Sequence, residues 1–141
     1  MRIVYIGQRG DQFVKVVAEH PEVDAAHVIW AGKWRRYHGE SLLKKLFDFK
    51  TVFFNIRDAF LVVLGCLQSF FLLGRLRPSV VFIKGGFVGV PVGKAAGWRN
   101  IPYITHDSDA IPGLANRLVA KKAAMHAVAL PKELYKGYPQ D

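Results

Sequence analysis

The stretch 78–118, PSVVFIKGGFVGVPVGKAAGWRNIPYITHDSDAIPGLANRL, decides the fold class because it places two short apolar runs directly before two glycine-rich or polar loops. The first run, 80–83, has no polar alternation, which is typical of a parallel strand covered on both faces. The second run, 102–105, is expected to end where the loop 106–109, HDSD, begins. A helix is predicted between them, at about 90–98. Ligands of open α/β sheets bind outside the carboxyl ends of such strands.

Three glycines and a proline follow the first of these strands, at Gly85, Gly86, Gly89 and Pro91. Glycine adopts positive φ readily and lets backbone N–H groups approach an anion. The N-terminus of the next helix would point its amides at the same place, and Lys84 adds positive charge. We favour an anion-binding loop here; a purely structural turn is the alternative.

The rest of the chain alternates in the same manner. Strands are predicted at 3–6, 26–30 and 127–130, with a further short one at 52–54; helices are predicted at 13–20, 42–49, 56–76 and 115–124. This order indicates an α/β fold, a Rossmann-like doubly wound parallel sheet, and 141 residues correspond to one domain. The single cysteine, Cys66, excludes an internal disulfide and is expected to be a small buried side chain.

Polar loops after two strands suggest ligand chemistry. Gly7-Gln8-Arg9-Gly10 has the position of a phosphate-binding turn, and Arg9 could add a charge-assisted contact, although a tight turn without a chemical role is the alternative. It lacks the third glycine of the dinucleotide fingerprint, which disfavours a nicotinamide cofactor. The histidines show no metal-ligand spacing, so we expect neither a metal ion nor a cofactor. In the loop 106–109 a carboxylate that accepts a substrate hydroxyl fits better than a metal site, and a loop held by side-chain hydrogen bonds is the alternative.

The composition is strongly basic, with a formal net charge of +9. Such an excess attracts polyanions, anionic lipid head groups or phosphorylated substrates. The apolar run 59–73 is shorter than the about 20 residues that a bilayer span needs, and arginines flank it. It is therefore either a helix in the membrane interface or a core crossover helix. The segment 33–38, KWRRYH, suits a membrane interface, a nucleic acid or a solvated loop.

The joint pattern of 77–123 resembles the N-terminal, acceptor-binding domain of the MurG-like enzymes of glycosyltransferase family 28, which have the GT-B fold. Those proteins carry P-D-V-V, a G-G-Y or G-G-F loop, G-I-P, H-E-Q-N and P-G-L-A-N-R/K at the corresponding places. The resemblance implies a peripheral protein at the cytoplasmic face of the cell membrane. Its enzyme would transfer N-acetylglucosamine from a UDP-sugar to a polyprenyl-diphosphate-linked acceptor in peptidoglycan biosynthesis.

Site residues follow from the resemblance by position. The acceptor diphosphate would be bound by Gly7, Arg9, Gly10, Gly85, Gly86, Phe87, His106, Asp109 and Asn116. The membrane would be contacted by Phe60, Leu64, Phe70, Phe71 and Arg75. The family's first loop, G-G-T-G-G-H, ends here in Gln12, which cannot act as a general base. We therefore expect Asp107 or Asp11 to deprotonate the acceptor hydroxyl.

The family's donor-binding C-terminal domain has no counterpart in these 141 residues. We expect it in a continuation of the polypeptide or in a separate partner chain, and we expect this chain alone to be inactive. One alternative is a non-catalytic membrane-anchoring subunit of a split transferase. A basic nucleic-acid-binding domain is the other; its affinity would fall steeply with salt, and we expect no nucleic acid as partner.

Overall fold

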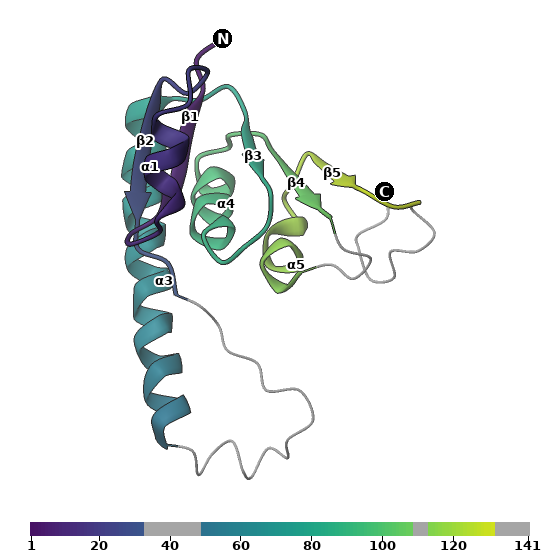
Figure 1. Cartoon of the computed structure of the whole chain (residues 1–141). Helices are drawn as coiled ribbons and strands as arrows, with labels where there is room; N and C mark the ends of the chain where they lie inside the picture. The colour runs from purple at the N-terminus through teal and green to yellow at the C-terminus, as the bar shows by residue number, and fades with distance from the viewer. Residues whose placement is uncertain (33–48, 109–112, 132–141) are drawn as a thin grey trace.

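The computed structural model describes residues 1–32, 49–108 and 113–131, and the side chains of 49–51 are not part of that description. Strands and helices alternate along it (Figure 1). The strands are β1 (Val4–Gln8), β2 (Ala25–Ile29), β3 (Val81–Ile83), β4 (Tyr103–Asp107) and β5 (Met125–Val128). The helices are α1 (Phe13–Ala18), α3 (Phe49–Leu76), α4 (Gly89–Trp98) and α5 (Leu114–Ala120).

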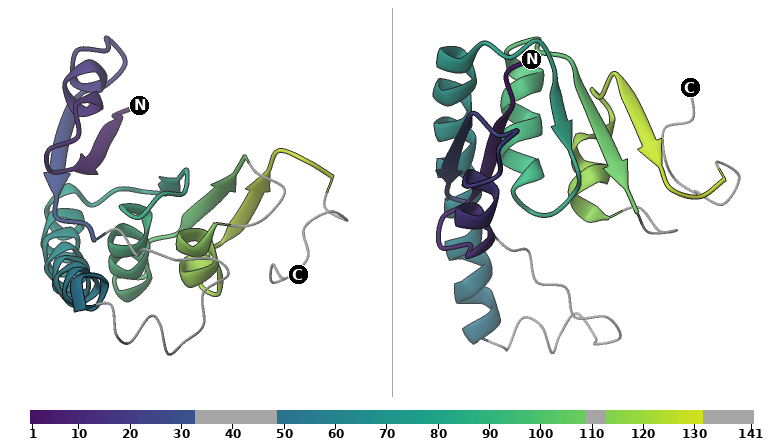
Figure 2. Two further views of the ribbon diagram at one scale, coloured as in Figure 1. Left: turned by 60° about the horizontal axis from the view of Figure 1, so that its bottom comes forward. Right: turned by 45° about the horizontal axis from the view of Figure 1, so that its top comes forward.

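All the strand pairs in the described residues are parallel, which confirms the predicted Rossmann-like α/β fold. β1 pairs with β2, and β3, β4 and β5 form a second sheet in that order. α4 and α5 lie on one side of the three-stranded sheet, while the two-stranded sheet lies beside α3 (Figure 2). The core joins these layers and consists of Leu73, Ile83, Ala95, Ala96, Tyr103 and Val119.

α3 touches the end of β2 backbone to backbone. A Cβ on Gly65 would overlap the carbonyl oxygen of Trp30, and a Cβ on Gly32 would overlap that of Asp58. The side chain of Gln68 accepts a hydrogen bond from the Trp30 amide at 2.8 Å. These contacts fix both the distance and the rotation of α3 relative to β2.

Two sequence predictions are corrected by the structure. The short strand at 52–54 is wrong, because these residues lie inside α3; their β-branched and aromatic side chains fit a strand, but tertiary context decides such runs. His106 and Asp107 lie in β4 rather than in a loop, because their pairing with Ala127 and Val128 of β5 extends the ladder. The part of the predicted helix 42–49 before residue 49 lies outside the described residues.

Cys66 is buried on α3, as predicted. Burial raises the pKa of its thiol, and the charge of Lys94 opposes that effect. A protonated, buried thiol is a packing group and a poor nucleophile.

Candidate functional site

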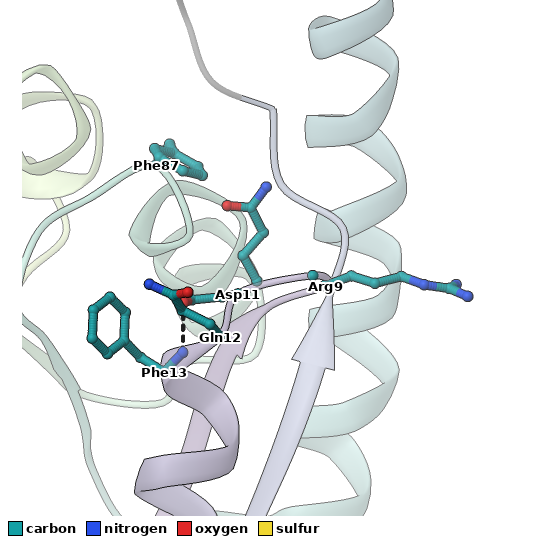
Figure 3. A pocket seen from close by; sticks show the side chains of 7 residues that line it. Arg9, Asp11, Gln12, Phe13 and Phe87 are labelled. Carbon is teal, nitrogen blue, oxygen red and sulfur yellow. Dashed lines mark hydrogen bonds between the residues drawn. The ribbon is translucent and has the colours of Figure 1, made fainter.

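An open hollow of about 400 Å³ lies at the carboxyl end of β1. The loop from Gln8 to Phe13 forms most of its wall, and Phe87, in the loop that follows β3, also lines it (Figure 3). The two glycine loops singled out in the sequence therefore do meet in space. Phe13, Gln8 and Gln12 also line the hollow; their place directly beside the first glycine turn was the signal available in the sequence.

Glycines with positive φ shape both of these loops. Gly10 has a φ of 85° and Gly86 a φ of 73°, and nothing lies within 4 Å of where a Cβ would be at either residue. Positive φ and open space let backbone N–H groups face a ligand. Gly7 differs, because a Cβ there would lie 2.7 Å from Cγ2 of Val14. Its small size serves the packing of α1 against β1.

The two charged residues of the first loop have separate roles. Oδ1 of Asp11 accepts a hydrogen bond from the Phe13 amide at 2.9 Å, a local turn contact that orients the carboxylate at the edge of the hollow. The Arg9 guanidinium stacks over the ring of Trp30, 4.8 Å from its centroid. In Figure 3 the Arg9 side chain points away from Phe87 and the hollow. Arg9 thus contributes positive charge to the surroundings rather than a group aimed into the hollow.

A second cluster lies where β3, β4 and α5 meet. Nδ2 of Asn116 donates to the carbonyl oxygen of His106 at 2.8 Å, and the amide of Asn116 lies beside Gly85, whose φ is 88°. Asn116 is 0% exposed, and among the described residues its Oδ1 has no hydrogen-bond partner. The buried side chain of Asn116 therefore lies between the glycine loop and β4 and does not line open space.

Asp107 and His106 sit side by side at the end of β4 and face opposite ways. Asp107 is 7% exposed, and its Oδ1 accepts from the Gly113 amide at 3.3 Å, at the start of α5. The His106 ring lies against Phe82, with 6.0 Å between ring centroids. Burial lowers the pKa of nearby His126, and the charge of Asp107 opposes that shift. Asp109, predicted to bind the diphosphate, lies outside the described residues.

Within the described part of the chain, no group of three or more His, Cys, Asp or Glu side chains could hold a metal ion.

One face of α3 exposes a continuous series of large apolar side chains. We call it the α3 stripe; its members, 46% to 71% exposed, are Phe53, Ile56, Phe60, Val63, Leu64, Leu67 and Phe71. Three of the residues predicted to contact a membrane, Phe60, Leu64 and Phe71, belong to it, and Arg75 is exposed near its end. Phe70 does not belong, because it packs against the core and carries the Arg99 guanidinium over its ring.

The helix is also longer than the apolar run in the sequence suggests. By length and composition the segment Val52–Leu76 could cross a membrane. However, buried Asp58 and Ser69 lie on its inner face. α3 therefore has one face that packs against the rest of the domain and one face that is exposed.

Comparisons with known proteins agree with this architecture. The model of the glycosyltransferase family 28 N-terminal domain matches residues 3–128. The crystal structure of Acinetobacter baumannii MurG covers 99% of this chain with a TM-score of 0.71 and 16% identity, which shows a common fold, and the match spans 35% of that chain.

Curated relatives with this similarity carry the name UDP-N-acetylglucosamine–N-acetylmuramyl-(pentapeptide) pyrophosphoryl-undecaprenol N-acetylglucosamine transferase. The Clostridium kluyveri protein is 44% identical over 77% of this chain and 27% of its own length. One from Bacillus thuringiensis is 37% identical over 97% of this chain and 37% of its own length. The chain thus spans roughly a third of the proteins it matches. By the family model and the shared fold, the chain belongs to the glycosyltransferase family 28 N-terminal domain family.

Proposed function

We propose that this chain supplies the acceptor-binding, membrane-side part of an N-acetylglucosaminyltransferase. The acceptor is a polyprenyl-diphosphate-linked sugar of peptidoglycan synthesis, and the donor is UDP-N-acetylglucosamine. The names of the relatives support these substrates. The observation that carries the proposal is the hollow at the end of β1, which is lined by the first glycine turn and by two aromatic residues, Phe13 and Phe87, of which Phe87 directly follows Gly86 of the second glycine loop.

The hollow suits a diphosphate attached to a lipid. Gly10 and Gly86 have positive φ and open space where a Cβ would be, and the net charge of +9 favours an anionic ligand at long range. Phe87 and Phe13 add apolar surface at the same place. Phosphate groups and the first part of an alkyl chain are the chemistry that such a lining recognises.

Transfer is a displacement at the anomeric carbon of the donor sugar. The acceptor hydroxyl attacks that carbon, its proton passes to a carboxylate, and UDP departs with the electrons of the broken glycosidic bond. Asp107 and Asp11 are the candidate bases, and one oxygen of each accepts a hydrogen bond from a backbone amide. The UDP-sugar is bound by a donor-binding partner, in the same polypeptide or in a separate one.

We infer that the α3 stripe contacts the cytoplasmic face of the membrane, and its seven exposed apolar side chains support this. In Figure 1 the N-terminal half of α3 projects past the edge at which β1 and β2 end, toward the side of the first loop. Because the opposite face of α3 packs against β2 and α4, we infer that the helix lies along the interface. A lipid-linked acceptor would then meet the hollow at the membrane surface.

Binding of a short-chain polyprenyl diphosphate, measured by calorimetry, tests the acceptor site. Valine at Gly86 disfavours the φ of 73° that presents the loop amides, so we expect Gly86→Val to weaken binding about tenfold or more. Gly97→Ala on α4 is the matched control, because it lies outside the hollow and has ordinary helical backbone. Equal affinities for the wild type and folded Gly86→Val would contradict the proposed site.

A further inference from the structure

Two buried polar side chains of β4 point toward α5. Thr105 and Asp107 are alternate residues of this strand, so they lie on the same face of the sheet. They are 0% and 7% exposed, and Oδ1 of Asp107 accepts a hydrogen bond from the Gly113 amide at the start of α5. Thr105 pairs in register with His126 of β5. Because residues in register have adjacent side chains on the same face, the ring of His126 lies beside Thr105 and diagonal to Asp107.

A hydrogen bond fixes the His126 ring in this place. Its Nδ1 lies 2.6 Å from Oγ1 of Thr105. A neutral imidazole with its proton on Nε2 accepts this bond from the threonine hydroxyl, and an imidazolium donates it to the hydroxyl oxygen. The contact is therefore available in both protonation states, and the ring gains a positive charge without leaving its position.

Asp107 is the charge that acts on this ring among the described residues. Burial lowers the pKa of His126, and the carboxylate of Asp107 opposes that effect. Tyr103 lies on the same face of β4, but burial raises its pKa, so its hydroxyl, which donates to the carbonyl oxygen of Val119, is neutral where a histidine titrates. The residues that α5 buries against the sheet are uncharged: Asn116, Val119 and Ala120. The cations on α5 and just after it are exposed: Arg117, Lys121 and Lys122.

We propose that His126 is a positioning residue that tunes Asp107 as the base of the transfer reaction. This inference rests on the proposed function, because it takes Asp107 as the group that accepts the proton of the acceptor hydroxyl. Interaction between two titrating groups is reciprocal: the carboxylate favours the imidazolium, and the imidazolium favours the carboxylate. A carboxylate stabilised in this way accepts a proton less readily, so transfer slows as the pH falls through the titration of His126. Above that range the ring is uncharged and does not weaken the base.

Histidine titrations followed by NMR test the coupling on the chain alone. In Asp107→Asn we expect a lower pKa for His126 than in the wild type, because the carboxylate that raises it is absent. The asparagine oxygen can still accept from the Gly113 amide, so the start of α5 keeps its contact. His20 and His27 are the internal references; they lie outside the β3–β4–β5 sheet, and their signals should titrate identically in the two proteins.

The pH dependence of kcat tests the consequence for catalysis. The chain is combined with the donor-binding half of the Clostridium kluyveri relative, and kcat is measured about one pH unit above and about one below the His126 midpoint found by NMR. Between these values we expect kcat of His126→Gln to fall about threefold less than that of the wild type, because glutamine accepts the Thr105 bond and acquires no charge. His27→Gln is the matched control; this residue pairs with Ile6 in the other sheet and should leave the wild-type fall unchanged.

The two measurements separate the outcomes. An unchanged His126 pKa in Asp107→Asn, shown to be folded by circular dichroism, would overturn the coupling. Equal falls in kcat for the wild type and His126→Gln would overturn the tuning, since a purely structural histidine leaves the pH profile unaltered, and so would full activity of Asp107→Asn. If the reconstituted wild type transfers no sugar, the proposed function is rejected, and the NMR comparison still decides whether His126 and Asp107 are coupled.

Discussion

Gly65 shows how a single missing side chain positions the longest helix. A Cβ at this residue would overlap the backbone oxygen of Trp30. The contact is between the backbone of Gly65 and the backbone of Trp30, so no flexible side chain can move aside. The close approach of α3 to β2 is therefore possible with glycine and not with any larger residue.

Gly65→Ala is predicted to lower the free energy of unfolding by about 1–3 kcal/mol, because overpacking outweighs the better helix propensity of alanine. Gly74→Ala on the same helix is the control. Its Cβ would meet only the end of the Arg99 side chain, at 2.6 Å, which can move. We expect this variant to be neutral or slightly stabilised. Urea denaturation measures both; similar stabilities for the two variants would refute the contact.

The direction in which each side chain points was the hardest feature to predict from the sequence. Phe70 and Phe71 are adjacent in one apolar run, yet a helix turns about 100° per residue, so one packs inward and the other is 71% exposed. The stacking of Arg9 on Trp30 and the burial of Asn116 likewise depend on neighbours distant in sequence. The glycines with positive φ, Gly10, Gly85 and Gly86, were predictable because no other residue adopts that backbone conformation easily.

At the scale of an element, α3 combines two surfaces that the sequence presents as one hydrophobic run. Its inner face carries small and polar residues, such as Gly65 and Ser69, because it touches backbone and α4. The α3 stripe carries the large side chains. Composition predicted the membrane interface or the core as alternatives; the structure packs one face of α3 and leaves the α3 stripe exposed.

Sedimentation with anionic vesicles tests the α3 stripe. We expect the double variant Phe60→Asp, Phe71→Asp to pellet at least about tenfold less than the wild type, because each buried phenylalanine side chain is worth about 1.5–3 kcal/mol. Val16→Asp on α1 removes a similarly exposed apolar residue, 65%, from another element and should pellet normally. Equal pelleting of all three proteins would exclude the stripe as the membrane contact.

At the scale of the whole molecule, element order was predictable and the division of the sheet was not. Alternating strand and helix patterns gave the parallel α/β fold, since β-branched runs and glycine loops are local signals. The end of β4 was misplaced because His106 and Asp107 are held in the strand by pairing with β5, a non-local contact. Likewise, nothing local shows that β1 and β2 pair separately from β3.

Reconstitution of activity tests the molecule as a unit. We expect no transfer of N-acetylglucosamine by this chain alone and transfer once a donor half is added. The two variants are Asp107→Asn and Asp11→Asn. In the reconstituted enzyme, the one that replaces the base should lower kcat about 10²–10⁴-fold and remove the acidic limb of the pH profile. Glu22→Gln, at an exposed residue outside the hollow, is the control. Full activity of both aspartate variants would exclude Asp107 and Asp11 as the base.

The locked rotation of α3 also bears on solubility. Gly65 and Gln68 hold the helix against Trp30, so the α3 stripe keeps its outward direction. Among the described residues nothing covers it, and exposed apolar surface has a free-energy cost in water. On the proposed function, contact with a membrane removes that cost without any rearrangement of the fold.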